Sequence, residues 1–189
     1  MGLETYSEFE LLRDGRRVEI RALRPEDRDA LMAAVKGMNS ESFYRRFFAV
    51  KHDFSEAEID YFVDVDFVSH VALVAEVQED GHNMIAGGGR YIVATKTRGQ
   101  VAQQGEVAQQ GQVAQQGEVA FAVIDKYQGQ GIGTMLMRHL VEIARQAGLQ
   151  ELIADVLPAN RQMLKIFQTC GLPMATRLED GAVHVTLKL

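Results

Sequence analysis

Runs of apolar and polar positions in the first half of the chain predict a hairpin followed by helices. Extended runs at residues 9–12 and 17–23 flank an Asp-Gly dipeptide, which suits a hairpin turn with a positive φ. A helix is expected at 24–37, because a proline and two acidic residues stand near its start. A second short helix is expected at 40–49, and the capping box at 55–58 indicates the start of a third.

The next apolar runs predict a pair of strands. Residues 71–77 and 84–94 are rich in β-branched and apolar side chains, and the polar segment 80–83 between them is typical of a turn. Three consecutive glycines at 87–89 fall inside the second strand. Glycines in a strand indicate a bulge or a place where another backbone approaches closely.

From residue 118 onward, strands and helices are expected to alternate, and Gly148 and Gly171 are expected to end the two helices. The expected order is strand 118–124, helix 131–147, strand 151–157, helix 160–170, and strands 173–178 and 182–188, the last two joined by a turn at 179–181. The longer helix carries an apolar stripe that predicts packing on a sheet, formed by Ile132, Leu136, Leu140, Ile143 and Ala147.

A repeat with a period of six residues interrupts this pattern. The sequence VAQQG begins at 101, 107 and 113, and the copies are separated by Gln or Glu. Hexads with an aliphatic position resemble those of left-handed β-helices, but so few turns could not bury a core. We therefore interpret residues 96–117 as a low-complexity insertion that extends one hairpin of an α/β (α+β) domain spanning 1–189.

Composition narrows the class of protein. With 189 residues, of which 47% are hydrophobic, the chain can bury one sizeable core. A net charge of −6 argues against nucleic-acid binding, which needs clustered Lys and Arg. Neither a leader nor a membrane segment is expected. The single cysteine, Cys170, is expected to be a small core residue. Because one cysteine cannot form an internal disulfide, we expect a reducing, cytoplasmic location. The five histidines show no paired spacing, so we expect no metal.

The segment 128–133, QGQGIG, lies between an apolar strand and an amphipathic helix and is the strongest candidate for chemistry. Its glycines allow successive N–H groups and the positive end of the helix to face one concavity, which suits a pyrophosphate. A P-loop is rejected because the loop has no Lys or Ser in place. The dinucleotide-binding fingerprint would need a glycine where Thr134 stands, and too few strand–helix units follow the loop. Asp155 does lie at the sequence separation expected for a residue that contacts the ribose.

This segment resembles the QxxGxG coenzyme A motif of the GNAT acyltransferase family. The resemblance extends to 160–171, NRQMLKIFQTCG, which is similar to the family's next helix, ending in Gly plus an apolar residue. It covers nearly the whole chain from about Arg17, the repeat excepted. The resemblance implies a mixed, mostly antiparallel central sheet flanked by helices. It also implies an N-acetyltransferase that moves acetyl from acetyl-CoA to a primary amine, on a small molecule or a protein lysine, by direct attack.

The same resemblance implies where the cofactor lies. One strand is expected to pair through its backbone with the pantetheine arm, and the loop is expected to hold the pyrophosphate. Asn160 matches a residue that often contacts the cofactor, and it serves equally well as a helix cap. The implied cofactor-binding residues are Phe121, Ala122, Val123, Gln128, Gly129, Gln130, Gly131, Ile132, Gly133, Thr134 and Asn160.

Catalysis requires a base, because a lysine-like ammonium has a pKa of ~10.4 and is charged at neutral pH. Glu118 matches a glutamate that serves as the base in relatives with a similar EVAF sequence, while a surface charge at a strand end is the alternative. Phe167 stands where many relatives carry a tyrosine that protonates the departing thiolate. Tyr127 is expected to pack under the loop, so no acid is assigned. A non-catalytic acyl-CoA sensor remains the alternative function, and a homodimer is compatible with either.

Overall fold

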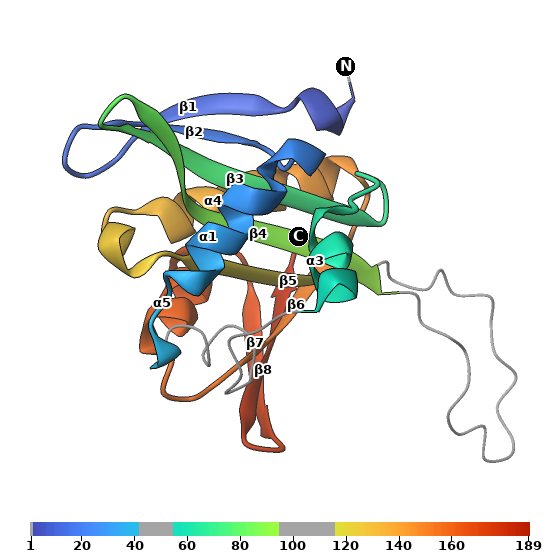
Figure 1. The fold of residues 1–189 in the computed structure, drawn as a ribbon. Helices are drawn as coiled ribbons and strands as arrows, with labels where there is room; N and C mark the ends of the chain where they lie inside the picture. Colours follow the sequence, from blue (N-terminus) through green and yellow to red (C-terminus); the bar gives the residue numbers. More distant parts are fainter. Residues whose placement is uncertain (1, 42–54, 95–115) are drawn as a thin grey trace, which may run out of the picture.

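The computed structural model describes residues 2–41, 55–94 and 116–189, in which one eight-stranded sheet forms the centre (Figure 1). The strand order is β1-β2-β3-β4-β5-β6-β8-β7. Every pairing is antiparallel except that of β5 with β6, so the prediction of a mixed, mostly antiparallel sheet is confirmed. The strands are β1 Ser7–Leu11, β2 Arg17–Ala22, β3 His70–Glu79, β4 His82–Ala94, β5 Gln116–Val123, β6 Glu151–Val156, β7 Met174–Glu179 and β8 Ala182–Lys188.

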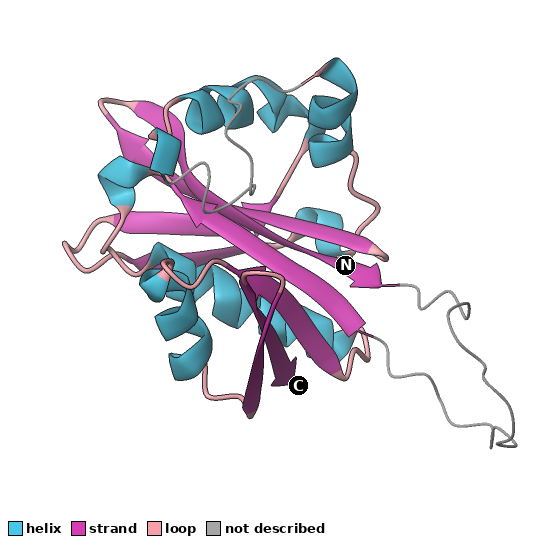
Figure 2. Cartoon of the chain, turned by 90° about the horizontal axis from the view of Figure 1, so that it is seen from below, coloured by secondary structure: helices cyan, strands magenta, loops and turns pink. Residues whose placement is uncertain are grey.

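Helices cover both faces of the sheet, as the view from below shows (Figure 2). On one face, α1 (Arg28–Lys36) and α3 (Glu56–Val63) pack over a small apolar cluster that contains Leu23 and Val74. The other face carries the main core, with α4 (Ile132–Gln146) and α5 (Arg161–Thr169). None of the helices in the described ranges has the length and apolarity needed to cross a membrane.

Most local predictions are confirmed, and the bounds of several elements need adjustment. The capping box is present, since the Ser55 hydroxyl accepts from the Glu58 N–H and the Glu58 carboxylate accepts from the Ser55 N–H. The turn expected at 80–83 is shorter, because Asp80 and Gly81 alone take positive φ values, 50° and 79°, and the strand resumes at once. Most of the helix predicted at 40–49 and of the hexad repeat lies outside the described residues.

The apolar stripe on α4 is confirmed with one exception. Ile132, Leu136, Leu140 and Ile143 are buried in the main core. Ala147 is exposed, which corrects the prediction. The helix ends at Gln146, and the left-handed Gly148 that follows closes it before β6 begins at Glu151.

The glycines of β4 allow a close approach between strands. The register between β3 and β4 shifts at Ala75/Glu76, so the predicted bulge is present. A Cβ atom on Gly87 would lie 2.8 Å from the carbonyl oxygen of Ala122 on β5, nearer than real Cβ contacts come. These features bring β4 tightly against β5 and fix the strand that borders the cavity described below.

β5 is paired very differently along its two edges. It pairs with β4 over its whole length, from Gln116 to Val123, and starts two residues earlier than predicted. Its parallel pairing with β6 covers only Gln116 to Glu118. Beyond Glu118, the two strands separate, and no strand among the described residues pairs with this edge of β5.

An ion cluster fixes the other half of the sheet. The guanidinium of Arg21 on β2 lies 2.7 Å from the Asp27 carboxylate and 2.6 Å from that of Glu76 on β3, and both Arg21 and Asp27 are buried. Burial raises the pKa of Asp27, but hydrogen bonds from Arg21 and from the Arg24 N–H outweigh it, so the pKa lies below its ordinary value. The charges of this cluster are therefore satisfied within the protein.

Candidate active site

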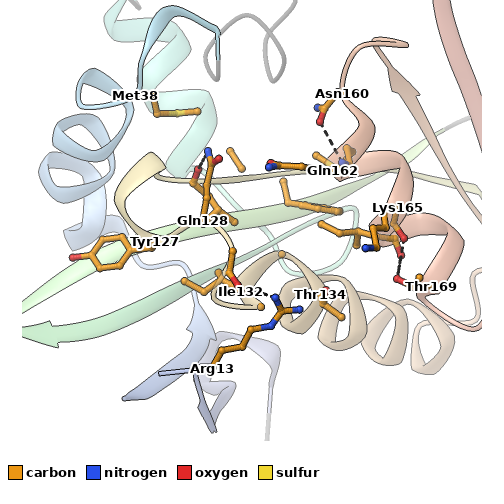
Figure 3. Close-up of a pocket in the computed structure, with 18 residues that line it drawn as sticks. Arg13, Met38, Tyr127, Gln128, Ile132, Thr134, Asn160, Gln162, Lys165 and Thr169 are labelled. Atoms are coloured by element: carbon orange, nitrogen blue, oxygen red, sulfur yellow. Dashed lines mark hydrogen bonds between the residues drawn. The ribbon is translucent and has the colours of Figure 1, made fainter. Parts of the chain in front are cut away.

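A cavity of about 310 Å³ lies where β5 and β6 separate, between the 128–133 loop and α5 (Figure 3). Ten of the eleven residues predicted to bind the cofactor line it, all except Gln130. Its lining residues are Arg13, Met38, Phe121, Ala122, Val123, Tyr127, Gln128, Gly129, Gly131, Ile132, Gly133, Thr134, Asn160, Gln162, Met163, Lys165, Ile166 and Thr169.

The loop presents a row of backbone donors. Gly129 and Gly131 have φ values of 79° and 97°, which side chains rarely adopt, and α4 begins at Ile132. Across the described part of the chain, the N–H groups from Gly129 to Gly133 donate to no other group of the protein. A concavity lined by such donors at a helix start suits a phosphate group.

The charges around the cavity match this geometry. The chain has 26 acidic residues, yet none of them is among the lining residues, whereas Arg13 and Lys165 both are. A cation-lined cavity in a protein of net charge −6 favours a negatively charged ligand. The residues present therefore fit a coenzyme A thioester, with its pyrophosphate against the loop and its pantetheine arm along the open edge of β5.

The two glutamines of the motif, Gln128 and Gln130, differ in what their side chains contact. The Gln128 amide donates to the Val123 carbonyl at 3.1 Å and to the Asp125 carboxylate at 2.9 Å, which ties the end of β5 to the loop. The Gln130 side chain does not line the cavity, and its amide oxygen is buried without a partner in the described ranges. Gln130 can therefore contribute its backbone N–H to a ligand, but not its side chain.

Asn160 caps a helix at the wall of the cavity. It is buried, and its side-chain oxygen accepts from the Met163 N–H at 3.2 Å, so it caps α5. It also lines the cavity (Figure 3). The start of α5 is thereby held at the wall where the pantetheine arm is expected.

Neither aromatic residue near the site is placed to protonate a leaving thiolate. Phe167 is buried in the core, edge-on to Phe121 with ring centroids 5.7 Å apart, and has no proton to give. Tyr127 packs under the loop as predicted, and its hydroxyl donates to the Glu79 carboxylate at 2.7 Å. Burial and the contact with Glu79 raise the pKa of Tyr127 to about 12, which makes it a poor acid at neutral pH.

A second, smaller cavity of about 70 Å³ adjoins the first on the opposite face of the sheet. The two cavities share Met38 and Ala122. Its described lining is mostly apolar, with side chains of α1 facing small residues of β4 and β5, and Arg90 is the charged member. The Arg90 guanidinium lies 3.2 Å from the His70 imidazole and 4.7 Å from the centre of the Phe62 ring.

Glu118 lies outside both cavities. It is exposed on β5, between Ile92 of β4 and Ile153 of β6 in the pairing register. Because side chains alternate along a strand, Glu118 shares a face with Ala120 and Ala122, which line the second cavity. At ~3.3 Å per residue, its Cα lies ~13 Å along the strand from that of Ala122.

Sequence reasoning missed several lining residues. Arg13 comes from the turn between β1 and β2, and no local pattern links it to a loop 116 positions later. Lys165 and Thr169, in contrast, follow Asn160 and Gln162 at helical spacing on α5. That face of the helix is given by extending the Gln162 position by one and two turns, to Lys165 and Thr169.

Comparisons with known proteins agree with this geometry. The sequence profile of the acetyltransferase (GNAT) family matches residues 34–172. An acetyltransferase of Pseudomonas aeruginosa is 33% identical over 180 residues, covering 95% of this chain and 87% of that protein. The acetyltransferase Pat of Mycolicibacterium smegmatis is 29% identical over 160 residues, and the match covers 85% of this chain but 42% of that longer protein. The crystal structure of the GNAT domain of S. lividans PAT superposes with a TM-score of 0.80 at 30% identity, covering 97% of both chains.

Proposed function

Because this chain belongs to the acetyltransferase (GNAT) family, we propose that it acetylates the side-chain amine of a lysine in a protein or peptide. The protein is an acetyl-CoA-dependent N-acetyltransferase, as its family and its named relatives indicate. That activity favours the enzyme over the acyl-CoA sensor considered from the sequence. What remains to be proposed is where acetyl-CoA binds, which amine accepts the acetyl group, and which residue acts as the base.

Acetyl-CoA is placed in the larger cavity. The N–H groups of residues 129–133 bind its pyrophosphate, and the pantetheine arm follows the edge of β5 at Phe121, Ala122 and Val123. The thioester then lies near Ala122, where the two cavities meet. This placement orients the acetyl carbonyl toward the face of the sheet that α1 covers.

The apolar lining of the second cavity is the observation that favours a lysine acceptor. An aminosugar or another amine rich in hydroxyls would lose hydration there without gaining partners from apolar walls. The four methylene groups of a lysine side chain have the opposite preference, since they gain from burial while the amine reaches the thioester. The described lining includes no carboxylate to hold a second ammonium group.

Glu118 is proposed as the base. Its carboxylate accepts a proton from the acceptor ammonium, through water across the distance given by its register position. The neutral nitrogen attacks the thioester carbonyl, an N–C bond forms, the C–S bond breaks and the coenzyme A thiolate leaves. The extra proton on the attacking nitrogen passes to solvent water, which leaves the neutral amide. Because a thiol has a reference pKa of ~8.5, the thiolate is a tolerable leaving group without an acid from Phe167 or Tyr127.

A thiol-release assay tests the acceptor class. We expect acetyl-CoA to be consumed with a lysine-containing peptide, and not with the same peptide in which arginine replaces lysine. A polyamine and an aminosugar at equal concentration should react far more slowly. Faster turnover with the aminosugar than with the peptide would contradict the lysine proposal while leaving acetyl transfer itself intact.

A further inference from the structure

The hairpin formed by β1 and β2 places a positively charged side chain, that of Arg13, at the cavity. Arg13 stands in the turn of this hairpin, and its Nη1 donates to the Gly129 carbonyl at 3.0 Å. The backbone N–H of Arg13 donates to the Gln130 carbonyl at 3.3 Å. Figure 3 shows the guanidinium at the end of the cavity where Thr134 and Ile132 lie, away from Asn160 and Gln162.

These two bonds place Arg13 on the carbonyl side of the loop. In a trans peptide, the C=O and N–H groups point in opposite directions, and the described residues contain no cis bond. The N–H groups of Gln130 and Gly131 therefore point away from Arg13. A pyrophosphate held by these donors lies on the other side of the loop from the guanidinium.

The guanidinium still has donors to offer a ligand. Arg13 is exposed and lines the cavity, and its Nε and Nη2 groups have no partner among the described residues. Coenzyme A carries one phosphate besides the pyrophosphate, the 3′-phosphate of its ribose. An arginine at the solvent-exposed rim can bind such a phosphate through a charge-assisted pair of hydrogen bonds.

We propose that Arg13 binds the 3′-phosphate of coenzyme A and makes the enzyme selective for acetyl-CoA over acetyl-dephospho-CoA, which lacks that phosphate. The proposal rests on the placement of the pyrophosphate given above. It adds a residue that lies outside the loop and helix of the motif. The hairpin thus contributes directly to the choice of acyl donor.

Calorimetric titration of the full chain with both thioesters tests this assignment. The wild-type protein should bind acetyl-CoA about tenfold more tightly than acetyl-dephospho-CoA, because only acetyl-CoA can make the charge-assisted contact with Arg13. Arg13→Gln should weaken acetyl-CoA binding about tenfold and leave acetyl-dephospho-CoA unchanged, because the backbone bond to Gln130 remains. Arg17→Gln is the matched control; it removes one positive charge from the same hairpin, where Arg17 lies over the Phe9 ring, and should preserve the wild-type preference.

The other outcomes are distinguishable. Equal weakening of both thioesters by Arg13→Gln would mean that Arg13 supports the loop or contacts the pyrophosphate, and would overturn the 3′-phosphate assignment. Unchanged binding of both would overturn it as well. Failure of the wild-type protein to bind either thioester would instead contradict the proposed function.

Discussion

The two edges of β5 show how one strand can serve both the fold and the site. On the β4 side, the pairing continues from Gln116 to Val123, and Gly87 brings the backbones together. On the β6 side, the pairing ends at Glu118. The first edge uses its hydrogen-bonding groups for stability. The second leaves them for a ligand, and the cavity lies there.

Charged side chains are also paired differently in the closed part of the sheet and at the open edge of β5. On the closed side, Arg21 is satisfied by Asp27 and Glu76 within the protein. On the open side, Arg13 and Lys165 line the cavity, and the lining residues include no carboxylate. A cavity lined by cations and by N–H groups without protein partners among the described residues favours a negatively charged ligand. Substitutions on the two sides should therefore have separable effects.

Gly131→Asp should have the largest effect, because it adds a carboxylate and a side chain where the phosphates approach. We expect acetyl-CoA to produce no thermal shift with this variant. Gly148→Asp is the control, since Gly148 has a similar left-handed φ of 79° and a Cβ there would meet nothing within 4 Å. Both variants should lose about 1–2 kcal/mol of stability from the backbone, but only Gly131→Asp should lose binding.

Glu118→Gln should lower kcat about 100-fold without changing acetyl-CoA affinity, because it removes the proposed base and no contact with the cofactor. The deficit should be greatest at low pH, where little of the acceptor amine is neutral without assistance. Steady-state thiol release across pH measures it. Glu106 stands in an identical GEVA sequence, outside the described residues, and Glu106→Gln should be silent. Equal losses from the two variants would refute the choice of Glu118.

Asp27→Asn should affect stability alone. Removing one partner of a buried ion pair costs about 3 kcal/mol, and acetyl-CoA affinity should stay at the wild-type value. The pKa of Asp27 is lowered in the folded protein, so its contribution is present above the unfolded pKa of ~3.9 and is lost as the pH falls through the lower folded value. The difference in Tm between variant and wild type should therefore shrink below about pH 4. A constant difference down to pH 2 would contradict this assignment.

Phe167→Tyr should have the smallest effect. The ring is buried against Phe121 and is not among the cavity-lining residues, so a new hydroxyl is not expected to reach the thiolate. We expect kcat to stay the same or rise by less than the ~100-fold that a positioned acid supplies. Steady-state kinetics with a Tm measurement separates a catalytic gain from a loss of packing. A large fall in kcat with unchanged Tm would show that the position matters for chemistry in a way that burial does not explain.

Local features of the fold were predictable from the sequence, because short-range chemistry determines them. The Ser55 capping box, the left-handed glycines and the donor-rich loop each depend on residues a few positions apart. The ten predicted cofactor-binding residues that line the cavity came from the family resemblance, which rests on one strand, one loop and one helix start.

Long-range features were not predictable. No pattern near Glu118 shows that β6 leaves β5 at that point, and none links Arg13 to Gly129. Periodicity also placed Ala147 in the core, although the helix ends one residue earlier. These properties depend on how separate elements meet, and a single sequence read by local patterns does not contain that information.

Amide hydrogen exchange, measured residue by residue with and without acetyl-CoA, tests most directly whether the open edge of β5 and its loop bind the cofactor. The N–H groups of residues 129–133 have no partner within the described protein, so they should exchange fast in the free enzyme and slow down strongly when acetyl-CoA binds. Amides of the β3–β4 pairing should change little, because they are already bonded. Saturation with acetyl-CoA that protects other segments and leaves 129–133 unprotected would contradict the account.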